Sequence, residues 1–277
     1  MAVPLTADLH THTSFSDGTE TPDRVIELAM QAGLSAIAIT DHDTLEGLPQ
    51  AEAAARQHGV ELIPGIEMSA SMDAIEVHLL GYWLNAAHPG LQQHLSEQQA
   101  RRMNRAREMV TRLQRMGLQV TAEEVFALAG EGTVGRPHVA RALLNRGYVS
   151  TMAEAFERYL GPKGPAFVPG SPLPPSRILQ VIREASGVPV LAHPVYLKDD
   201  TLIDGLVEQG LAGLEVYHSS HTPELIQRYE QIAKRLHLLA TGGSDYHGNA
   251  KEGAAIGAVK VPYALVEGLK QWVVARR

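Results

Sequence analysis

Histidines and carboxylates recur in this sequence directly after short apolar runs, and such residues can hold metal ions. The first run ends in Asp8-Leu-His10-Thr-His12, and Asp17 follows five residues later. Residues i and i+2 of a strand point to the same side, so His10 and His12 can present both imidazoles to one ion. A lone pair of this kind is weak support, because two incidental surface histidines would give the same pattern.

Other apolar runs end with the same kinds of side chain. They are followed by Thr40-Asp41-His42-Asp43, Gly65-Ile-Glu67, Ala192-His193-Pro194 and Gly243-Ser244-Asp245-Tyr246-His247-Gly248. Barrel enzymes assemble their active sites at the carboxyl ends of strands, where these residues are expected to lie. Two other interpretations stay open for single residues: Asp43 could cap the next helix, and Asp41 could orient an imidazole.

His78 differs from the others because it lies inside the apolar run 74–83. A lone histidine in such a run is usually a satisfied core residue. We interpret His78 as a metal ligand, because Glu67 and His78 could face the same barrel interior.

The sequence contains no cysteine, so any metal must be bound by His, Asp and Glu. A ligand set without sulfur suits manganese, iron(II) or zinc, and a shared carboxylate suits two ions about 3.5–4 Å apart. Two cations lower the pKa of a bridging water, so that hydroxide can attack a phosphorus atom in line. The predicted chemistry is therefore metal-assisted hydrolysis without a Ser or Cys nucleophile.

Seven short apolar runs are the strands expected to position these residues. They cover residues 5–10, 35–40, 60–66, 74–83, 188–193, 212–217 and 236–242. Their alternation with helical segments predicts an α/β barrel or a doubly wound sheet. Apolar residues on both faces indicate buried parallel strands.

Residues 91–175 interrupt this alternation with four predicted helices and no strand. The signals are an Arg-rich segment at 91–116, capping-box patterns at Thr121 and Thr151, and a helix that starts at Arg136 and ends at Gly147. Six prolines and three glycines at 161–175 predict a stiff return linker. We expect a barrel made of residues 1–90 and 176–277, with residues 91–175 as a helical insert.

Composition excludes several other classes of protein. The chain has 277 residues, 44% hydrophobic and 20% charged, which fits a globular protein rather than a disordered or fibrous one. A net charge of -7 argues against a protein that binds duplex DNA. No signal-peptide pattern and no apolar run of about 18 residues is present, so we expect a cytoplasmic protein that does not bind membranes.

These motifs together resemble the PHP (polymerase and histidinol phosphatase) family of metal-dependent phosphoesterases, in the amidohydrolase-like superfamily. DLHTHTSFSDG, ITDHDT, GIE, AHP and GSDYHG follow the order of that family from residue 8 to residue 248. The resemblance implies a distorted seven-stranded (β/α) barrel that holds two to three divalent ions, with manganese preferred over iron(II) and zinc.

The resemblance also implies three groups of ligands. They are His10, His12, Glu67 and Asp245 for one ion, Glu67, His78 and His193 for a second, and Asp17, His42 and His247 for a third. No ligand position is substituted, which argues against a non-catalytic metal or nucleotide sensor.

The insert carries a phosphate-binding signal of its own. Gly135-Arg136-Pro137-His138 places a guanidinium beside a helix N-terminus, where free N–H groups favour anions. A surface arginine in a solvated cap is the simpler alternative. The element also resembles one in the PHP subfamily of nucleotide 3′,5′-bisphosphate phosphatases and 5′-3′ oligoribonucleases, so we predict phosphate contacts from Arg136 and His138.

His218 and His221 follow the sixth predicted strand and are expected at the mouth of the barrel. We predict that both contact phosphate and that His218 could protonate the leaving group. Together with Asp245 and Arg136, His218 forms the predicted catalytic set. The six arginines between residues 101 and 115 are more typical of a solvated helix face than of a funnel for RNA.

The favoured function is hydrolysis of a nucleotide phosphomonoester. Resemblance to the subfamily implies the 3′-phosphate of a nucleoside 3′,5′-bisphosphate, which would leave a 5′-monophosphate. Alternatives that stay open are 5′-3′ trimming of short oligoribonucleotides and hydrolysis of histidinol phosphate. An amidohydrolase acting on carboxamides would leave Arg136 without a role. The sequence does not indicate an oligomeric state.

Overall fold

A computed structural model describes residues 5–72, 75–170, 173–250 and 254–276. Position 74 of the fourth predicted strand and positions 171–172 of the predicted linker lie outside the described residues.

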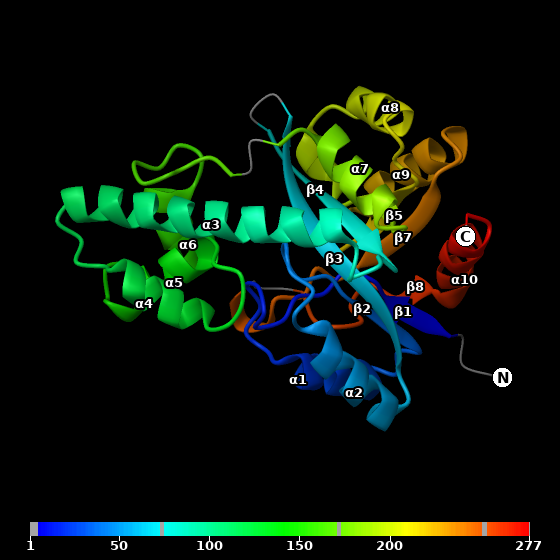
Figure 1. The fold of residues 1–277 in the computed structure, drawn as a ribbon, viewed down its shortest axis with the longest axis horizontal. Helices are drawn as coiled ribbons and strands as arrows, with labels where there is room; N and C mark the ends of the chain where they lie inside the picture. Colours follow the sequence, from blue (N-terminus) through cyan, green and yellow to red (C-terminus); the bar gives the residue numbers. More distant parts are fainter. Residues whose placement is uncertain (1–4, 73–74, 171–172, 251–253, 277) are drawn as a thin grey trace.

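One mixed sheet forms the centre of the molecule (Figure 1). Its strands follow the order β7-β6-β5-β4-β3-β2-β1-β8. They are β1 (Thr6–Asp8), β2 (Ala36–Ile39), β3 (Glu61–Met72), β4 (Ile75–Tyr82), β5 (Val188–Leu191), β6 (Gly213–His218), β7 (Leu239–Gly243) and β8 (Val261–Pro262).

Backbone hydrogen bonds between β1 and β7 nearly close this sheet into a barrel. The Leu9 N–H donates to the carbonyl of Gly242 at 3.0 Å, and the Asp245 N–H donates to the carbonyl of His10 at 2.9 Å. Thr11 forms a parallel bridge with Tyr246. The predicted α/β barrel is confirmed.

The prediction of parallel strands is wrong for β4, which runs antiparallel to β3 and to β5. Pairing with β4 extends β3 to Met72, beyond the predicted end at residue 66, because each added residue gains a ladder partner. The antiparallel strand β8 was not predicted. Two residues are too few to carry a periodic signal.

Helices surround the sheet and extend to one side of it (Figure 1). Within the described residues they are α1 (Pro22–Gln31), α2 (Leu48–His58), α3 (Pro89–Arg115), α4 (Ala122–Ala129), α5 (Arg136–Asn145), α6 (Met152–Ala155), α7 (Pro175–Glu184), α8 (Thr201–Glu208), α9 (Pro223–Arg235) and α10 (Tyr263–Val274). Single turns form η1 (Phe156–Leu160), η2 (Pro194–Leu197) and η3 (Gly248–Ala250).

Side-chain caps fix the starts of two helices as predicted. Thr121 accepts a hydrogen bond from the Glu124 N–H, and the Glu124 carboxylate accepts from the Thr121 N–H, which completes a capping box. Thr151 accepts from the Glu154 N–H in the same way. Such caps each contribute about 1 kcal/mol.

The segment from α3 to η1 projects from the barrel and has a hydrophobic cluster of its own (Figure 1). Leu113 of α3 and Val139 and Leu143 of α5 are fully buried in it. The first part of α3 instead packs on the barrel through Leu91. The described residues of 161–174 form neither helix nor strand. Division of the chain into barrel and insert stays a prediction.

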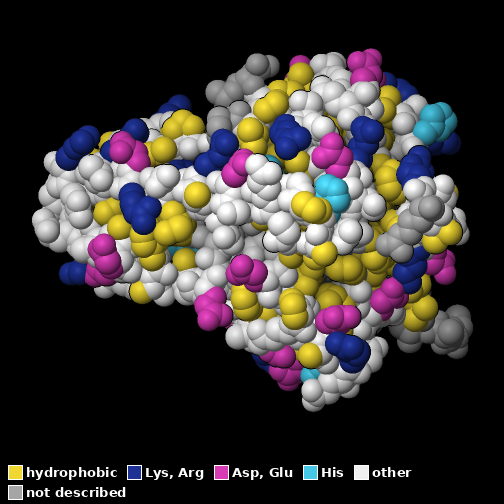
Figure 2. All heavy atoms as spheres, in the orientation of Figure 1, with side chains coloured by type: hydrophobic (Ala, Val, Ile, Leu, Met, Phe, Trp, Pro, Cys, Tyr) yellow, Lys and Arg dark blue, Asp and Glu magenta, His cyan; other side chains and the backbone are white. Residues whose placement is uncertain are grey.

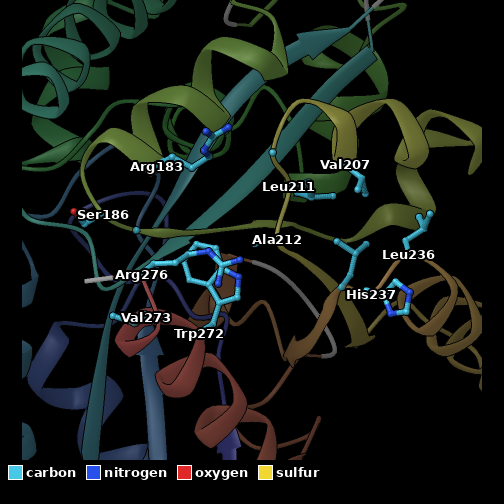
Figure 3. A pocket seen from close by; sticks show the side chains of 13 residues that line it. Arg183, Ser186, Val207, Leu211, Ala212, Leu236, His237, Trp272, Val273 and Arg276 are labelled. Carbon is cyan, nitrogen blue, oxygen red and sulfur yellow. The ribbon is translucent and has the colours of Figure 1, made fainter.

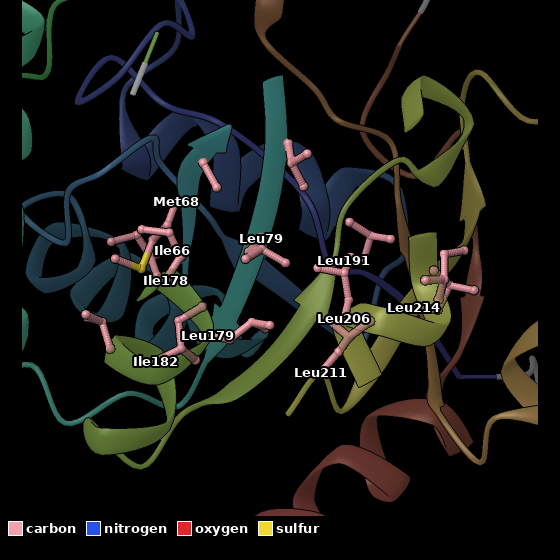
Figure 4. Packing of buried hydrophobic residues seen from close by; sticks show 14 of the residues in the cluster. Ile66, Met68, Leu79, Ile178, Leu179, Ile182, Leu191, Leu206, Leu211 and Leu214 are labelled. Carbon is pink, nitrogen blue, oxygen red and sulfur yellow. The ribbon is translucent and has the colours of Figure 1, made fainter. Parts of the chain in front are cut away.

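The largest hydrophobic cluster fixes β3 and β4 against α7 (Figure 4). Met68 and Leu79 of the sheet and Ile178 and Ile182 of the helix are fully buried there. Burial of each such side chain stabilises the fold by about 1.5–3 kcal/mol. Because β3 carries Glu67 between Ile66 and Met68, this packing also holds the Glu67 backbone in place.

No helix in the described part of the chain is long and apolar enough to cross a membrane. On the face shown in Figure 2, basic and acidic side chains are mixed and form no continuous basic surface. The absence of binding to duplex DNA stays a prediction. The cytoplasmic location stays a prediction.

Candidate metal centre and active site

All nine predicted metal ligands meet at one end of the barrel. Most of them come directly after β1, β2, β5 and β7, whereas Glu67 and His78 lie within the β3–β4 hairpin. A parallel bridge between His42 and Glu67 aligns the end of β2 with the middle of β3. The long hairpin therefore brings two interior strand residues to the level of the other strand ends.

The first predicted ligand group forms a compact cluster. Glu67 Oε2 lies 3.2 Å from His10 Nε2 and 3.1 Å from His12 Nε2. Asp245 Oδ1 lies 3.5 and 3.3 Å from the same two nitrogens. One ligand atom from each of the four residues falls within 4.8 Å of all the others.

The second predicted group uses the other oxygen of Glu67. Glu67 Oε1 lies 2.9 Å from His78 Nδ1 and 3.0 Å from His193 Nε2. The two oxygens of one buried carboxylate thus face two sets of imidazoles. This is the arrangement that a bridging ligand requires.

The third predicted group adjoins the first. Asp17 Oδ1 lies 3.2 Å from His247 Nε2, and Asp17 Oδ2 lies 3.7 Å from His42 Nε2. His12 belongs to this cluster as well, since its Nδ1 lies 3.8 Å from Asp17 Oδ1. His42 Nδ1 lies 3.3 Å from Glu67 Oε2, so His42 adjoins both this group and the bridging carboxylate.

Three buried atoms of the cluster lack hydrogen bonds within the described structure, as metal-binding atoms would. His12 Nε2, Asp17 Oδ1 and His42 Nδ1 lie close to other ligand atoms, yet none of them forms a hydrogen bond with a described residue. Buried polar atoms are normally paired, and ligand lone pairs aimed at an ion are a common reason for an exception. Imidazole and carboxylate donors without sulfur suit ions such as manganese, iron(II) and zinc. The assignment of each residue as a ligand stays a prediction.

Hydrogen bonds behind the ligands fix two imidazole tautomers. His10 Nδ1 lies 2.9 Å from Glu215 Oε1, and His247 Nδ1 lies 2.9 Å from the carbonyl of Asp245. A proton on each Nδ1 leaves the Nε2 lone pair directed into the cluster. Glu215 also accepts the backbone N–H of His193 at 2.7 Å. The sequence analysis missed Glu215, although a carboxylate inside the apolar run 212–217 was a signal.

His218 has the opposite tautomer. Its Nδ1 accepts the N–H of Ser220 at 3.0 Å, so the proton resides on Nε2, 3.4 Å from Asp245 Oδ2. A neutral imidazole with Nε2 protonated can donate a hydrogen bond but cannot bind a metal through that atom, and it is a poor proton donor because loss of the proton would leave an anion. This tautomer fits the predicted phosphate contact better than the predicted leaving-group acid, and both roles stay predictions.

The two other predicted phosphate contacts differ from each other. His138 Nδ1 accepts the Gly135 N–H at 2.9 Å, which leaves its Nε2–H as a donor. His221 Nδ1 lies 2.8 Å from the carbonyl of Val216, so its buried Nε2 is an acceptor in the neutral ring. Burial lowers the pKa of His221, which disfavours the charged ring that a phosphate contact requires. Neither assignment is tested.

Arg136 is linked to the predicted metal ligand His78 through the carboxylate of Glu76. Its Nη2 is 2.6 Å from Glu76 Oε2, and Glu76 Oε1 is 3.8 Å from His78 Nε2. Burial alone would raise the pKa of Glu76, but His78 and the nearby arginines outweigh it and hold that pKa well below its usual range. Arg105 is one of those arginines, and burial lowers its pKa to about 10. Sequence analysis identified neither Glu76 nor Arg105 as part of this site.

Asp41 and Asp43 have structural partners other than those considered from the sequence. Asp41 accepts hydrogen bonds from the Thr13 N–H at 2.7 Å and from Ser16 Oγ at 2.6 Å, and so it holds the loop after His12. Asp43 pairs with Arg102 Nη2 at 2.6 Å and does not cap α2. The N-cap residue of α2 is Gly47.

Three residues at the site have strained backbone conformations. Asp43, His193 and Asp245 have φ angles of 52°, 27° and 54°, in the region that favours glycine. Such conformations cost about 1–3 kcal/mol each and persist where the surrounding structure enforces them. Here the bonds from Glu215 to His193 and from Asp245 to His10 supply that enforcement.

The carboxylates and imidazoles shift one another's pKa in the metal-free protein. Burial alone would lower the pKa of His12 and of His78, but the carboxylates around them raise these pKa values to about 9 and about 10. Burial would raise the pKa of Glu67, yet the imidazoles keep that pKa well below its usual range. Burial lowers the pKa of His42 to about 3.

These shifts predict that the metal-free protein loses stability as the pH rises. For His12 and His78 the folded-state pKa exceeds the unfolded value of about 6.5, so their contribution is complete below pH 6.5 and is lost through pH 9–10. Thermal denaturation of EDTA-treated protein should give a Tm that falls between pH 6.5 and 10. The pKa of His42 is lowered to about 3, so this residue changes the pH dependence of stability only below pH 6.5. A Tm that is flat or rises over pH 6.5–10 would contradict the charge state assigned to the cluster.

A nearly closed α/β barrel with this donor cluster at its mouth defines a metal-dependent hydrolase of phosphate esters. Residues 8–161 match the model of the PHP domain family, and the chain belongs to that family. The predicted resemblance is confirmed.

Named relatives cover most of the chain. A 5′-3′ exoribonuclease of Haemophilus influenzae is 34% identical over 245 residues, which are 87% of this chain and 89% of the relative. A 3′,5′-nucleoside bisphosphate phosphatase of Chromobacterium violaceum is 33% identical and covers 90% of each chain. A phosphoribosyl 1,2-cyclic phosphate 1,2-diphosphodiesterase of Eggerthella lenta is 34% identical over 87% of this chain and 94% of its own.

A solved structure agrees with these relatives. A protein of Bifidobacterium adolescentis assigned as a metal-dependent phosphoesterase superimposes with a TM-score of 0.90. It is 33% identical, and the match covers 96% of both chains.

Proposed function

We propose that this protein hydrolyses a phosphomonoester of a nucleotide. The favoured substrate is a nucleoside 3′,5′-bisphosphate, which would lose its 3′-phosphate and leave a 5′-monophosphate. The name of the Chromobacterium violaceum relative, a 3′,5′-nucleoside bisphosphate phosphatase, supports the choice of substrate.

The observation that carries the proposal is a cationic element directly beside the metal cluster. Only the Glu76 carboxylate separates the Arg136 guanidinium from His78. A bisphosphate has one phosphate to be cleaved and another to be held. Arg136 can hold the remote phosphate while the reacting phosphate lies at the cluster, and binding energy at the remote group then orients the reacting one.

Two to three divalent ions, with manganese preferred, would be held by the three ligand groups around Glu67, His10, His78 and Asp17. When bound, such ions activate the attacking water and neutralise charge on the phosphoryl oxygens. The protein residues supply orientation and a hydrogen-bond donor. Asp245 Oδ2 accepts the His218 Nε2–H beside the cluster, and His218 would donate a hydrogen bond from this atom to the leaving ribose oxygen, which takes its proton from water.

The products formed from adenosine 3′,5′-bisphosphate test this proposal. With manganese present, phosphorus NMR or chromatography should show inorganic phosphate and 5′-AMP. Accumulation of 3′-AMP would invert the orientation. If no phosphate is released, the function moves to the oligonucleotide alternative.

That alternative is 5′-3′ trimming of short RNA, for which the Haemophilus influenzae relative is named. The arginines of α3 do not form an open RNA track, because several pair within the protein, as Arg136 does with Glu76. Arg102 pairs with Asp43, Arg105 donates to the carbonyl of Val168, and Arg112 pairs with Glu108. Release of mononucleotides from a 5′-phosphorylated trinucleotide, compared with phosphate release from the bisphosphate, ranks the two functions.

Replacing Arg136 by alanine should lower kcat/KM for the bisphosphate by about 10- to 150-fold, the value of a charge-assisted hydrogen bond of about 1.5–3 kcal/mol. The metals should remain bound, because Arg136 contacts Glu76 rather than a predicted ligand. The loss should be smaller for 3′-AMP, which lacks the remote phosphate. Arg146→Ala, at the other end of α5, is the matched control. Full kcat/KM on both substrates would show that Arg136 is not an anchor.

A further inference from the structure

A second cavity lies at the end of the barrel opposite the metal cluster. Its volume is about 600 Å³, within the usual range for ligand pockets of about 300–1,000 Å³. Its floor is formed where the chain enters β5, β6 and β7, at residues 186–187, 210–212 and 236–238. The metal cluster is instead built where these strands end. We call this cavity the basal pocket.

The lining of the basal pocket combines cations with aromatic surface (Figure 3). Arg183 of α7, and Arg276 and Trp272 at the end of the chain, project into it from opposite sides. The Arg276 guanidinium lies 4.1 Å from the centre of the Trp272 ring, so the two stack. Among the described residues the lining contains no Asp or Glu. In a chain with a net charge of -7, such a lining is a local reversal of charge.

The backbone is shaped to accommodate one of these cations. Gly210 has a φ of 105°, and a Cβ atom at this position would collide with Arg183 Nη1. Arg183 Nη1 in turn donates to the carbonyl of Gln209 at 3.3 Å. Arg183 thus lies against the turn before β6, where Gly210 leaves room for its guanidinium.

A strained residue contributes an imidazole to the same pocket. The turns before β2 and β3 use Gly33 and Gly59 at positive φ, whereas the turn before β7 uses His237 at a φ of 54°. A non-glycine residue in this conformation costs about 1–2 kcal/mol. Glycine at position 237 would relieve that strain. The histidine present there instead places its imidazole in the lining of the pocket (Figure 3).

We propose that the basal pocket binds a nucleoside monophosphate. The Arg183 guanidinium is the phosphate partner, and the Arg276–Trp272 stack is the surface for the base, since bases stack on aromatic rings and on guanidinium planes. Apolar side chains such as Leu211 and Leu238 complete the floor under the ring. The choice of a nucleotide over another aromatic anion rests on the proposed function. The lining of the pocket by itself indicates a ligand that carries both an anionic group and an aromatic ring.

Trp272 provides a local reporter, because the chain has only two tryptophans. In a Trp83→Phe background, AMP titrated into the full chain should change the Trp272 fluorescence in a saturable way. Inorganic phosphate and adenosine should each bind at least about 10-fold more weakly, since each offers only half of the contacts. Arg183→Ala should weaken AMP binding by about 10- to 150-fold, as expected for loss of a charge-assisted bond. Arg177→Ala on the same helix α7, outside the pocket lining, should stay within about twofold.

An unchanged Trp272 signal on addition of AMP, or equal AMP affinity in Arg183→Ala, would overturn the proposal. A shift in oligomeric state on Arg183→Ala without any response to AMP would also overturn it, because the pocket would then be an interface. Phosphate release from adenosine 3′,5′-bisphosphate is measured on the same samples. If AMP changes the Trp272 signal but no phosphate is released, the basal pocket is supported and the proposed function is rejected. If phosphate is released but AMP does not change the Trp272 signal, the proposed function is supported and the basal pocket is rejected.

Discussion

Replacing Glu67 by glutamine is expected to remove about two divalent ions from the protein and to lower kcat/KM by at least about 1000-fold. Both carboxylate oxygens are engaged, Oε2 with His10 and His12, and Oε1 with His78 and His193. A glutamine keeps one acceptor oxygen but turns an N–H₂ donor toward the other group. Loss of two shared cations removes several kcal/mol of charge stabilisation, and about 4 kcal/mol corresponds to 1000-fold.

Metal analysis of protein loaded with manganese and then desalted measures this effect directly. An ion held by Asp17, His42 and His247 should remain, since Glu67 does not belong to that group. Glu61→Gln, at the start of the same strand, is the matched control, because Glu61 pairs with Lys270 outside the cluster. If Glu67→Gln retains every ion of the parent protein, the bridging role is wrong.

Replacing His218 by alanine should lower kcat on a nucleotide substrate by about 100- to 1000-fold, the usual loss when one hydrogen-bond donor to a transition-state oxygen is removed. The reason is the tautomer, because the hydrogen bond from the Ser220 N–H leaves the proton of the neutral ring on Nε2, where it can donate a hydrogen bond. The metal content should not change, since a protonated Nε2 is not a ligand.

The leaving group separates stabilisation of the leaving oxygen from other roles of His218. p-Nitrophenolate is a stable anion that needs little stabilisation, so the loss on p-nitrophenyl phosphate should shrink to about 10-fold or less. His221→Ala should have a smaller effect on both substrates, because its Nε2 is an acceptor. An equal loss on both substrates would make His218 a phosphate contact only.

The sequence predicts the barrel well but misses the direction of one strand. Apolar periodicity reports burial and not direction, so it predicts a parallel strand where β4 is antiparallel. A signal was present, because only seven residues separate the predicted runs 60–66 and 74–83. A parallel crossover needs about a dozen or more residues, so this spacing favours a hairpin.

Within the site, eight of the nine predicted ligands were recognisable because they occur in local motifs, whereas His78 lies alone in an apolar run. The residues that support these ligands were not recognisable, because their roles depend on distant partners. Glu215 and His10 are 205 positions apart, and Arg136 and Glu76 are 60 apart. Only the folded barrel shows that Glu215 fixes a tautomer or that Glu76 stands between Arg136 and His78.

Closure of the barrel between β1 and β7 has a consequence for how the enzyme is made. His10 and His12 leave the ribosome before Asp245 and His247, which lie more than 230 positions later in the chain. At about 5–20 residues per second, roughly 10–50 seconds separate the two events. Until then the early histidines lack the acidic partner that completes their ligand group. A nascent chain that has not reached Asp245 therefore cannot complete its metal cluster and cannot act on a phosphate ester prematurely.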